Sequence, residues 1–509
     1  MEARAAMGAR ATKANIPTQA PSPFQGATVA RGTAVAEAEE PIQGTYPIEP
    51  YLMSNELNID MKVTHTLVNT CKNQSELTTP LKALTEPTTT LEALTESQKL
   101  NIRIKAKKML KDLGFKEIPP PTKHGGRIQY YLENWQTLTK DQWILDVIQG
   151  KPIEWLETPR QKTEPKELTF SSEMNAAVDV EIAKMLDMGV IQTCQECPDQ
   201  FVSTLFMRPK KDGGWRPIIN LKWVNQYLQY LHFKLEGMPD VIDQINKDDF
   251  QYKVDLSSAY WTVRLHPKDR KFMRFRWKGV LMEFLVWPFG LGPVPRWWTK
   301  LMKPAIALLR KMGAKNVIYM DDIWGGESDL EVSVLHTYLT VELLTLLGFV
   351  VNLPKSILDP TRILKEFLGF IVNSTELSLS LPEKRIKKIT EACKNILSQE
   401  QVTVRDLSKV IGQLVAAARA VLPAPLHYRK MQMTQISSLL KNQRNYGAQM
   451  SLNEECREEL KWWIENLSTW NGKSFIAASS PHTMQITTDA SKKGWGRCAN
   501  ERRRRVGGR

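Results

Sequence analysis

Three aspartates at the ends of short β-forming runs are the residues best suited to chemistry in this sequence. Asp321 and Asp322 lie in the run VIYMDDIW, where apolar β-formers lead directly into two carboxylates and Gly325-Gly326 follows shortly after. This pattern is typical of a β-hairpin with acids at its tip. Asp255 ends a second β-rich run, QYKVD. An isolated Asp-Asp pair is more often a polar turn, but a third carboxylate in the same setting favours a shared site.

Carboxylates grouped in this way are suited to phosphoryl transfer. That reaction needs little covalent help from protein, and two divalent ions held by acidic side chains can neutralise the charge on the attacking and leaving oxygens. Mg²⁺ prefers oxygen ligands and retains waters and phosphate oxygens, so Asp255, Asp321 and Asp322 would suffice and no His or Cys is required. The residues therefore predict a site for two Mg²⁺ ions, with Mn²⁺ as an acceptable replacement.

Five motifs resemble those of reverse transcriptases in order and separation. They are VDLSSAY (254–260), WPFGLGPVP (287–295), YMDD (319–322), LLGFVVNLPKS (346–356) and FLGF (367–370). Segments 125–150 and 403–432 most resemble the polymerases of DIRS-type retrotransposons, and the whole resemblance covers roughly residues 120 to 496. It implies an α+β right-hand polymerase fold with fingers, a palm built on an antiparallel sheet, and a helical thumb. It also implies an RNA-directed DNA polymerase that uses an RNA template, a DNA primer and deoxynucleoside triphosphates.

The resemblance gives roles to individual residues near the aspartates. Lys355 would protonate the pyrophosphate leaving group as a general acid, although a lysine beside a proline is otherwise an ordinary surface residue. Tyr260 would lie under the sugar of the incoming nucleotide and leave no room for a 2′-hydroxyl. The loop with Phe289 and Gly290 would contact the nascent base pair, because a glycine allows the backbone to come close.

A predicted hairpin would hold the nucleotide triphosphate. The run TLFMRPKKDGGWRPIIN contains two apolar strands around Asp-Gly-Gly, which predicts a β-hairpin. By the resemblance its tip closes over the nucleotide, with Lys210 or Lys211 and Arg216 on the triphosphate, where the planar fork of arginine suits phosphate oxygens. A solvated hairpin would have a similar composition.

Two segments between Asp255 and Asp321 carry further expectations. Residues 264–278 hold seven basic side chains against one acid and interleave them with aromatic rings. On strands this alternation would give a basic face toward template and primer, the alternative being a solvated strand pair. Trp297 and Trp298 stand where the family typically has one Phe, and we expect both indoles in the core.

Later segments would hold the primer and the product duplex. By the resemblance, a hairpin with Phe367, Leu368 and Gly369 at its turn grips the primer terminus. The pattern from Leu381 to about Thr469 is helical and resembles a thumb that packs on the duplex.

Composition favours a polyanionic partner. A formal charge of +14 and a pI near 9.3 let Lys and Arg displace counterions from phosphates. No apolar run approaches the ~20 residues of a membrane span, so we expect no membrane partner. Six scattered cysteines and the lack of a signal or transit pattern suit the cytoplasm or nucleus. The single CxxC of Cys194 and Cys197 is more often a pair of ordinary thiols than a zinc site.

The chain is expected to divide into six segments. A disordered low-complexity region is followed by a family-specific extension, the fingers and palm, the helical thumb with its tether, the first strand of a truncated ribonuclease H domain, and a basic tail. In that order these are residues 1–96, 97–168, 169–375, 376–475, 483–496 and 497–509. Since Asp489 is the one ribonuclease H carboxylate that matches, we expect no ribonuclease H activity.

Two rival functions remain open from the sequence. One is a catalytically inactive nucleic-acid-binding relic of the same fold. The other is a nuclease with the same two-metal chemistry, which is disfavoured because Tyr260 and the two substrate hairpins have no use in hydrolysis. Convergence of the three aspartates opposite the nucleotide-binding hairpin would favour the polymerase.

Overall fold

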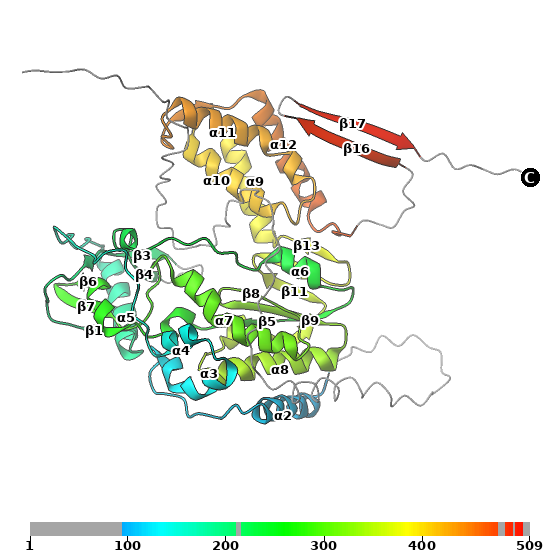
Figure 1. The fold of residues 1–509 in the computed structure, drawn as a ribbon. Helices are drawn as coiled ribbons and strands as arrows, with labels where there is room; N and C mark the ends of the chain where they lie inside the picture. Colours follow the sequence, from blue (N-terminus) through cyan, green and yellow to red (C-terminus); the bar gives the residue numbers. More distant parts are fainter. Residues whose placement is uncertain (1–93, 210–214, 477–483, 492–493, 502–509) are drawn as a thin grey trace, which may run out of the picture.

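The chain folds into a sheet-and-helix centre, a smaller sheet region beside it and a helical bundle (Figure 1). The computed structural model describes residues 94–209, 215–476, 484–491 and 494–501. Antiparallel sheets combined with helices confirm the predicted α+β class, and we call the three parts palm, fingers and thumb. Residues 1–93 of the expected low-complexity region lie outside the described residues.

The palm is a four-stranded antiparallel sheet with helices against it. Its strand order is β10 (Ile357–Thr361), β5 (Phe250–Asp255), β9 (Asp322–Glu327) and β8 (Asn316–Tyr319). Helix α8 (Leu330–Leu346) packs on β5, β9 and β10, while α7 (Val294–Lys311) packs on α8 and β8. Because α8 has the sheet on one side and another helix on the other, it is buried nearly all round, and its buried residues include polar ones such as His336 and Glu342.

The predicted hairpin around the two adjacent aspartates is confirmed. β8 pairs with β9 around the two-residue turn Met320-Asp321, with Tyr319 opposite Asp322. Gly325-Gly326 does not form a turn but lies inside β9. A Cβ on Gly325 would lie 2.2 Å from Cζ of the buried Tyr252 on β5, so the glycine makes room for that ring.

The N-terminal extension is part of the palm core. It contains α2 (Glu96–Asp112), η2 (Arg127–Tyr131), α3 (Leu132–Leu138) and α4 (Gln142–Ile148), and α2 lies along α8 (Figure 1). Nε1 of the fully buried Trp135 donates to the Leu347 carbonyl at 3.0 Å. Nδ2 of Asn134 donates to the Leu346 carbonyl at 2.7 Å. These bonds satisfy carbonyls at the end of α8, where a helix has no partners of its own.

The fingers consist of a sheet, a helix and a separate hairpin. The sheet order is β1 (Ile191–Thr193), β7 (Val280–Phe284), β6 (Arg274–Trp277) and β2 (Val202–Ser203). Helix α5 (Ser172–Asp187) buries Val178, Ile182 and Met185 and ends before Gly189. Strands β3 (Leu205–Pro209) and β4 (Trp215–Ile219) pair as the predicted hairpin.

The prediction that strands over 264–278 present one basic face is wrong, because only the end of this run is a strand and its cations are paired. The first half of this run is loop and the single-turn helix η5 (Pro267–Phe272). Arg274 is buried and pairs with Glu283 at 2.8 Å. Arg276 pairs with Glu164 and Glu196, and Lys278 pairs with Asp179 at 2.7 Å. Carboxylates from other segments neutralise these cations, and the sequence pattern alone did not show them.

The thumb is a bundle of four helices whose hydrophobic core continues to Val317 and Trp324 of the palm strands. The helices are α9 (Glu383–Leu397), α10 (Val404–Ala417), α11 (Arg429–Lys441) and α12 (Glu454–Trp470), which agrees with the helical pattern. A three-stranded sheet of β11 (Ile363–Phe367), β12 (Phe370–Asn373) and β13 (Ser378–Ser380) lies between thumb and palm (Figure 1). The short strands β14 (Gln401–Thr403) and β15 (Gln449–Ser451) pair beside the helices.

The last described residues form a two-stranded ladder. β16 (Met484–Ser491) pairs along its whole length with β17 (Gly494–Glu501). Strand structure therefore continues past the boundary placed at residue 497. The remaining short elements are α6 (Met238–Gln244), η3 (Val224–Tyr227), η4 (Ala259–Thr262), η6 (Leu353–Lys355) and η7 (Ala424–Leu426).

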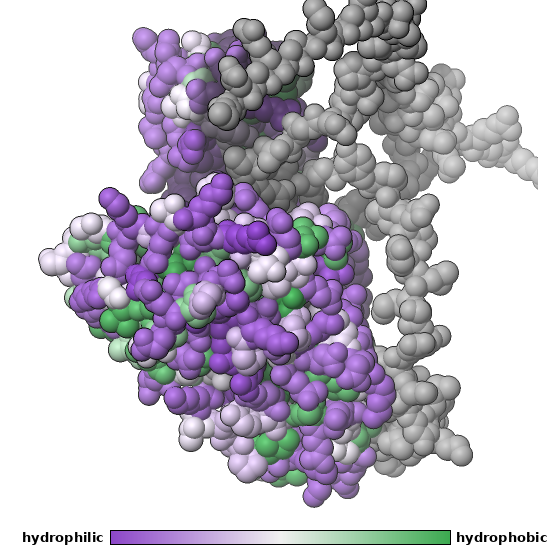
Figure 2. All heavy atoms as spheres, turned by 60° about the vertical axis from the view of Figure 1, so that its left-hand side comes forward, coloured by the Kyte–Doolittle hydropathy of each residue, from purple (hydrophilic) through white to green (hydrophobic). Residues whose placement is uncertain are grey.

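The surface on the fingers side is mainly hydrophilic, with apolar residues in small separate patches (Figure 2). No helix in the described part of the chain has both the length and the apolar character needed to cross a membrane.

Candidate active site

Asp255, Asp321 and Asp322 come together at one end of the palm sheet. Asp255 is the last residue of β5, Asp322 is the first of β9, and the two are direct cross-strand partners. Such partners project from the same face of an antiparallel sheet. Asp321 occupies the preceding turn, and its carbonyl accepts a hydrogen bond from the Leu256 N–H at 2.9 Å. Strand pairing thus places the turn against the residue that follows Asp255.

The three carboxylates are close enough to disturb one another's ionisation. Burial and the charges of Asp322 and Asp321 raise the pKa of Asp255 to about 6. Asp321 is solvent-accessible at the turn, yet partial burial of its carboxylate and the charge of Asp322 raise its pKa as well. Negative charge is therefore concentrated here without full compensation, which is the condition that attracts a cation.

Two lysines oppose this concentration of negative charge. Lys253 lies two residues before Asp255 on β5, hence on the same face, and its Nζ is 2.9 Å from Oδ1 of Asp322. Lys355 ends η6 and is exposed. The ammonium groups of Lys355 and Lys253 both lower the pKa values of Asp255 and Asp321.

Hydrogen bonds to β5 hold the segment that carries Lys355. The Asn352 N–H donates to the Asp255 carbonyl at 2.8 Å, and the Asp255 N–H donates to Oγ of Ser356 at 3.0 Å. The loop that contains Lys355, the predicted general acid, is therefore hydrogen-bonded to the end of β5, where Asp255 lies.

The donor set fits a divalent ion such as Mg²⁺. Oδ1 of Asp322 is buried and accepts no hydrogen bond, although Nζ of Lys253 lies 2.9 Å away as an ion-pair partner. Among the described residues, no three His, Cys, Asp or Glu side chains are already spaced to chelate an ion. Mg²⁺ does not require such a cage, since it keeps waters and uses substrate phosphates. The residues that would hold it are Asp255, Asp321 and Asp322.

Aromatic rings predicted to contact the nucleotide lie together beside the aspartates. The ring centroids of Tyr260, in η4, and Phe289 are 5.4 Å apart. Gly290 has a φ of 97°, which favours glycine, and its carbonyl accepts a hydrogen bond from Nδ2 of Asn225 at 2.9 Å. Oδ1 of Asn225 accepts from the Gly292 N–H at 2.8 Å, so one side chain clamps the loop at two points.

The substrate hairpins are present as backbone structures. Lys210 and Lys211 lie outside the described residues, and Arg216 is described only as a position on β4. In the second hairpin Leu368 and Gly369 form the turn between β11 and β12. Phe367 is fully buried in the thumb core, so a primer contact at this hairpin would fall on the turn itself.

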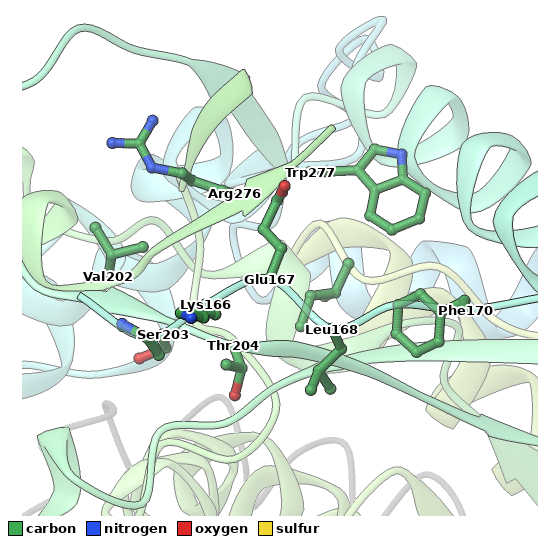
Figure 3. A pocket seen from close by; sticks show the side chains of 11 residues that line it. Lys166, Glu167, Leu168, Phe170, Val202, Ser203, Thr204, Arg276 and Trp277 are labelled. Atoms are coloured by element: carbon green, nitrogen blue, oxygen red, sulfur yellow. The ribbon is translucent and has the colours of Figure 1, made fainter. Parts of the chain in front are cut away.

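A small pocket in the fingers is separate from these residues. Lys166, Glu167 and Leu168 lie alongside Ser203 of β2, with Trp277 at one side (Figure 3). Its volume of about 10 Å³ accommodates roughly one water molecule, so it is not a substrate site. Burial raises the pKa of the Cys194 thiol to about 11.

Three residues of the site were not found from the sequence. Lys253 had a detectable signal, because strand alternation places it on the face of Asp255. Asn225 and Trp298 had none, since their roles depend on backbone groups far along the chain. Nε1 of Trp298 donates to the Met320 carbonyl at 2.8 Å, and the indole is fully buried, as expected for the core.

Comparison with known proteins agrees with this geometry. Residues 208–372 match the family model described as Reverse transcriptase (RNA-dependent DNA polymerase). The Tf2-3 and Tf2-7 transposon polyproteins of Schizosaccharomyces pombe are each 24% identical to this chain over 200 residues, which is 39% of this chain and 14% of each polyprotein.

Solved structures show a similar fold. A foamy viral protease-reverse transcriptase in complex with dsDNA has a TM-score of 0.55 at 15% identity, covering 89% of this chain and 80% of that one. The foamy viral protein in complex with an RNA/DNA hybrid has a TM-score of 0.54 at 15% identity, covering 90% and 54%. These likenesses confirm the predicted polymerase fold.

Proposed function

We propose that this chain, which carries a reverse-transcriptase domain over residues 208–372, is the RNA-directed DNA polymerase of a retrotransposon. The observation that carries the proposal is the grouping of three carboxylates at one end of the palm sheet, beside the rings of Tyr260 and Phe289. The resemblance of segments 125–150 and 403–432 extends the proposal to an element of DIRS type.

The reaction would join a primer 3′-hydroxyl to the α-phosphate of a deoxynucleoside triphosphate. Two Mg²⁺ ions, when bound, would neutralise charge on the attacking and leaving oxygens. The chain itself holds the reactants in place. Asp255 is ionised above about pH 6, Tyr260 occupies the space beneath the sugar, and Nζ of Lys355 can deliver a proton to the leaving pyrophosphate.

The fingers hairpin and the primer hairpin would supply the remaining contacts. In this proposal Lys210 or Lys211, with Arg216, binds the triphosphate from the β3–β4 hairpin. The turn of Leu368 and Gly369 supports the primer terminus. Nucleic acid is then enclosed between fingers, palm and thumb, and the positive net charge favours its binding.

Primer extension on an RNA template tests the proposal. Purified protein should extend a DNA primer with Mg²⁺ or Mn²⁺, and Asp321→Asn should lose at least ~100-fold in kcat, because charge stabilisation in the transition state is lost. Asp243→Asn on the exposed face of α6 is the matched control and should retain full activity. Full activity in Asp321→Asn would overturn the proposal. Wild-type protein that binds template-primer without extending it would instead identify an inactive relic.

A further inference from the structure

We propose that Trp298 is a positioning residue that couples recognition of the nucleotide sugar by Tyr260 to the placement of the turn containing Asp321. This inference rests on the proposed polymerase function, and it concerns a contact that the sequence motifs do not include. Trp297 and Trp298 stand where the resembling family typically has one Phe, a side chain that offers no N–H.

The first contact holds the catalytic turn by its backbone. Trp298 lies near the start of α7, is fully buried, and donates from Nε1 to the Met320 carbonyl at 2.8 Å. Met320 has a φ of 55°, a left-handed conformation that residues with side chains adopt rarely and that surrounding contacts must maintain. Met320 immediately precedes Asp321, so a shift of its carbonyl would also move the following carboxylate.

The second contact holds the same residue by its side chain. The Tyr260 hydroxyl donates to Sδ of Met320 at 3.3 Å. Burial and the charge of Asp321 raise the pKa of Tyr260, so the hydroxyl keeps its proton and remains a donor. The rings of Tyr260 and Trp298 also meet edge to face, with centroids 5.6 Å apart and an interplanar angle of 65°.

These contacts form a closed triangle of Trp298, Met320 and Tyr260. Trp298 is anchored on its other side by Phe349, at 5.5 Å between ring centroids. A ribonucleotide that pushes on the Tyr260 ring would therefore move Met320 and misplace Asp321. Discrimination against ribonucleotides should then lower kcat, whereas a ring that acts only by blocking space would mainly raise KM.

Two variants separate this role from simple packing. Trp298→Phe keeps an aromatic ring and removes the N–H donor. Trp297→Phe is the matched control, because it makes the same change one residue earlier, where the indole packs on Trp287 at 5.5 Å between centroids. Single-nucleotide incorporation should be measured for both sugars, together with Tm and with backbone hydrogen exchange of residues 317–324.

In Trp298→Phe we expect kcat for deoxynucleotides to fall about tenfold, with KM changed less than about twofold, because the Met320 carbonyl loses its donor. The kcat preference for deoxynucleotides should also shrink, and exchange in the turn should rise. Trp297→Phe should change none of these. Combined with Tyr260→Phe, the loss in kcat should be smaller than the product of the two single losses, because both variants release the same residue.

Other results would overturn the coupling. The coupling is wrong if Trp298→Phe has the same kcat and the same hydrogen exchange in the turn as Trp297→Phe, or if Trp298→Phe changes only Tm. It is also wrong if the kcat loss of the double variant with Tyr260→Phe equals the product of the two single losses. If wild-type protein extends no primer, the proposed function fails instead. Hydrogen exchange of the turn then still decides whether Trp298 positions Met320, since that measurement requires no catalysis.

Discussion

Asp255→Asn is expected to stabilise the metal-free protein while abolishing its activity. Burial and two neighbouring carboxylates raise the pKa of Asp255 to about 6, against an ordinary value of 3.8. A difference of about 2 in pKa corresponds to about 3 kcal/mol at 1.36 kcal/mol for each unit. Asparagine has the same shape and carries no charge, so it removes this penalty. The raised pKa already includes the opposing attraction of Lys253 and Lys355, so we expect a net gain of up to about 3 kcal/mol at pH 7.5.

The pH dependence of that gain has a definite sign. Between about pH 4 and pH 6, folded wild-type protein retains the Asp255 proton that the unfolded chain has released. Wild-type stability therefore falls as pH rises through this window, and Asp255→Asn lacks this loss. The stability difference between the two proteins should be close to zero near pH 4, grow through pH 5, and reach its full value above about pH 6.

Urea unfolding followed by tryptophan fluorescence in EDTA measures the difference at each pH. Asp243→Asn, on the exposed face of α6, controls for the general loss of one carboxylate. Added Mg²⁺ should then stabilise wild-type protein more than Asp255→Asn, because a ligand stabilises only the folded state that binds it. An Asp255→Asn protein that is less stable at pH 7.5, or a gap that is the same at pH 4.5 and 7.5, would refute the reasoning.

Three further predictions concern Tyr260, the fingers and the N-terminal extension. Tyr260→Val should admit ribonucleotides because the ring that excludes the 2′-hydroxyl is gone, which the ratio of kcat/KM values for the two sugars measures, and its loss in kcat for deoxynucleotides should match that of Tyr260→Phe. Arg274→Ala should destabilise the fingers by about 3 kcal/mol in urea unfolding because it leaves Glu283 buried without its partner, whereas Arg276→Ala, at a more exposed pair, should cost about 1 kcal/mol or less. Trp135→Phe should cost about 1–3 kcal/mol by leaving the Leu347 carbonyl without a donor, and an unchanged unfolding midpoint would contradict that role.

Local patterns predicted the elements that carry the site. The β-branched and aromatic residues before Asp321 and before Asp255 specify strands, and a strand that ends in an acid places that acid at the edge of a sheet. The register between β5 and β9 could not be obtained this way. It makes Asp255 the partner of Asp322, and it depends on the fit of buried side chains across both strands.

Glycine and charge patterns misled where tertiary packing decided the outcome. Gly325-Gly326 resembles a turn signal, but the Tyr252 ring on the next strand requires a position without a side chain. The basic run 264–278 resembles a nucleic-acid face, but Glu283 pairs with Arg274, and Glu164 and Glu196 pair with Arg276. Periodicity records which side chains share a face and not what lies opposite that face.

Lys253 is a residue of the site that strand alternation predicts when the rule is applied to every position near Asp255. Residues two apart on a strand share a face, so a lysine two positions before Asp255 must lie beside the carboxylates if Asp255 belongs to the site. The structure places its Nζ 2.9 Å from Asp322, where it offsets part of the repulsion that raises the pKa values of the other two aspartates. Asn225 and Trp298 could not be predicted in this way, because each donates a hydrogen bond to a carbonyl of a segment distant in the sequence. Charge balance within a catalytic strand is therefore predictable from sequence, whereas the hydrogen bonds that position its neighbouring turns require the fold.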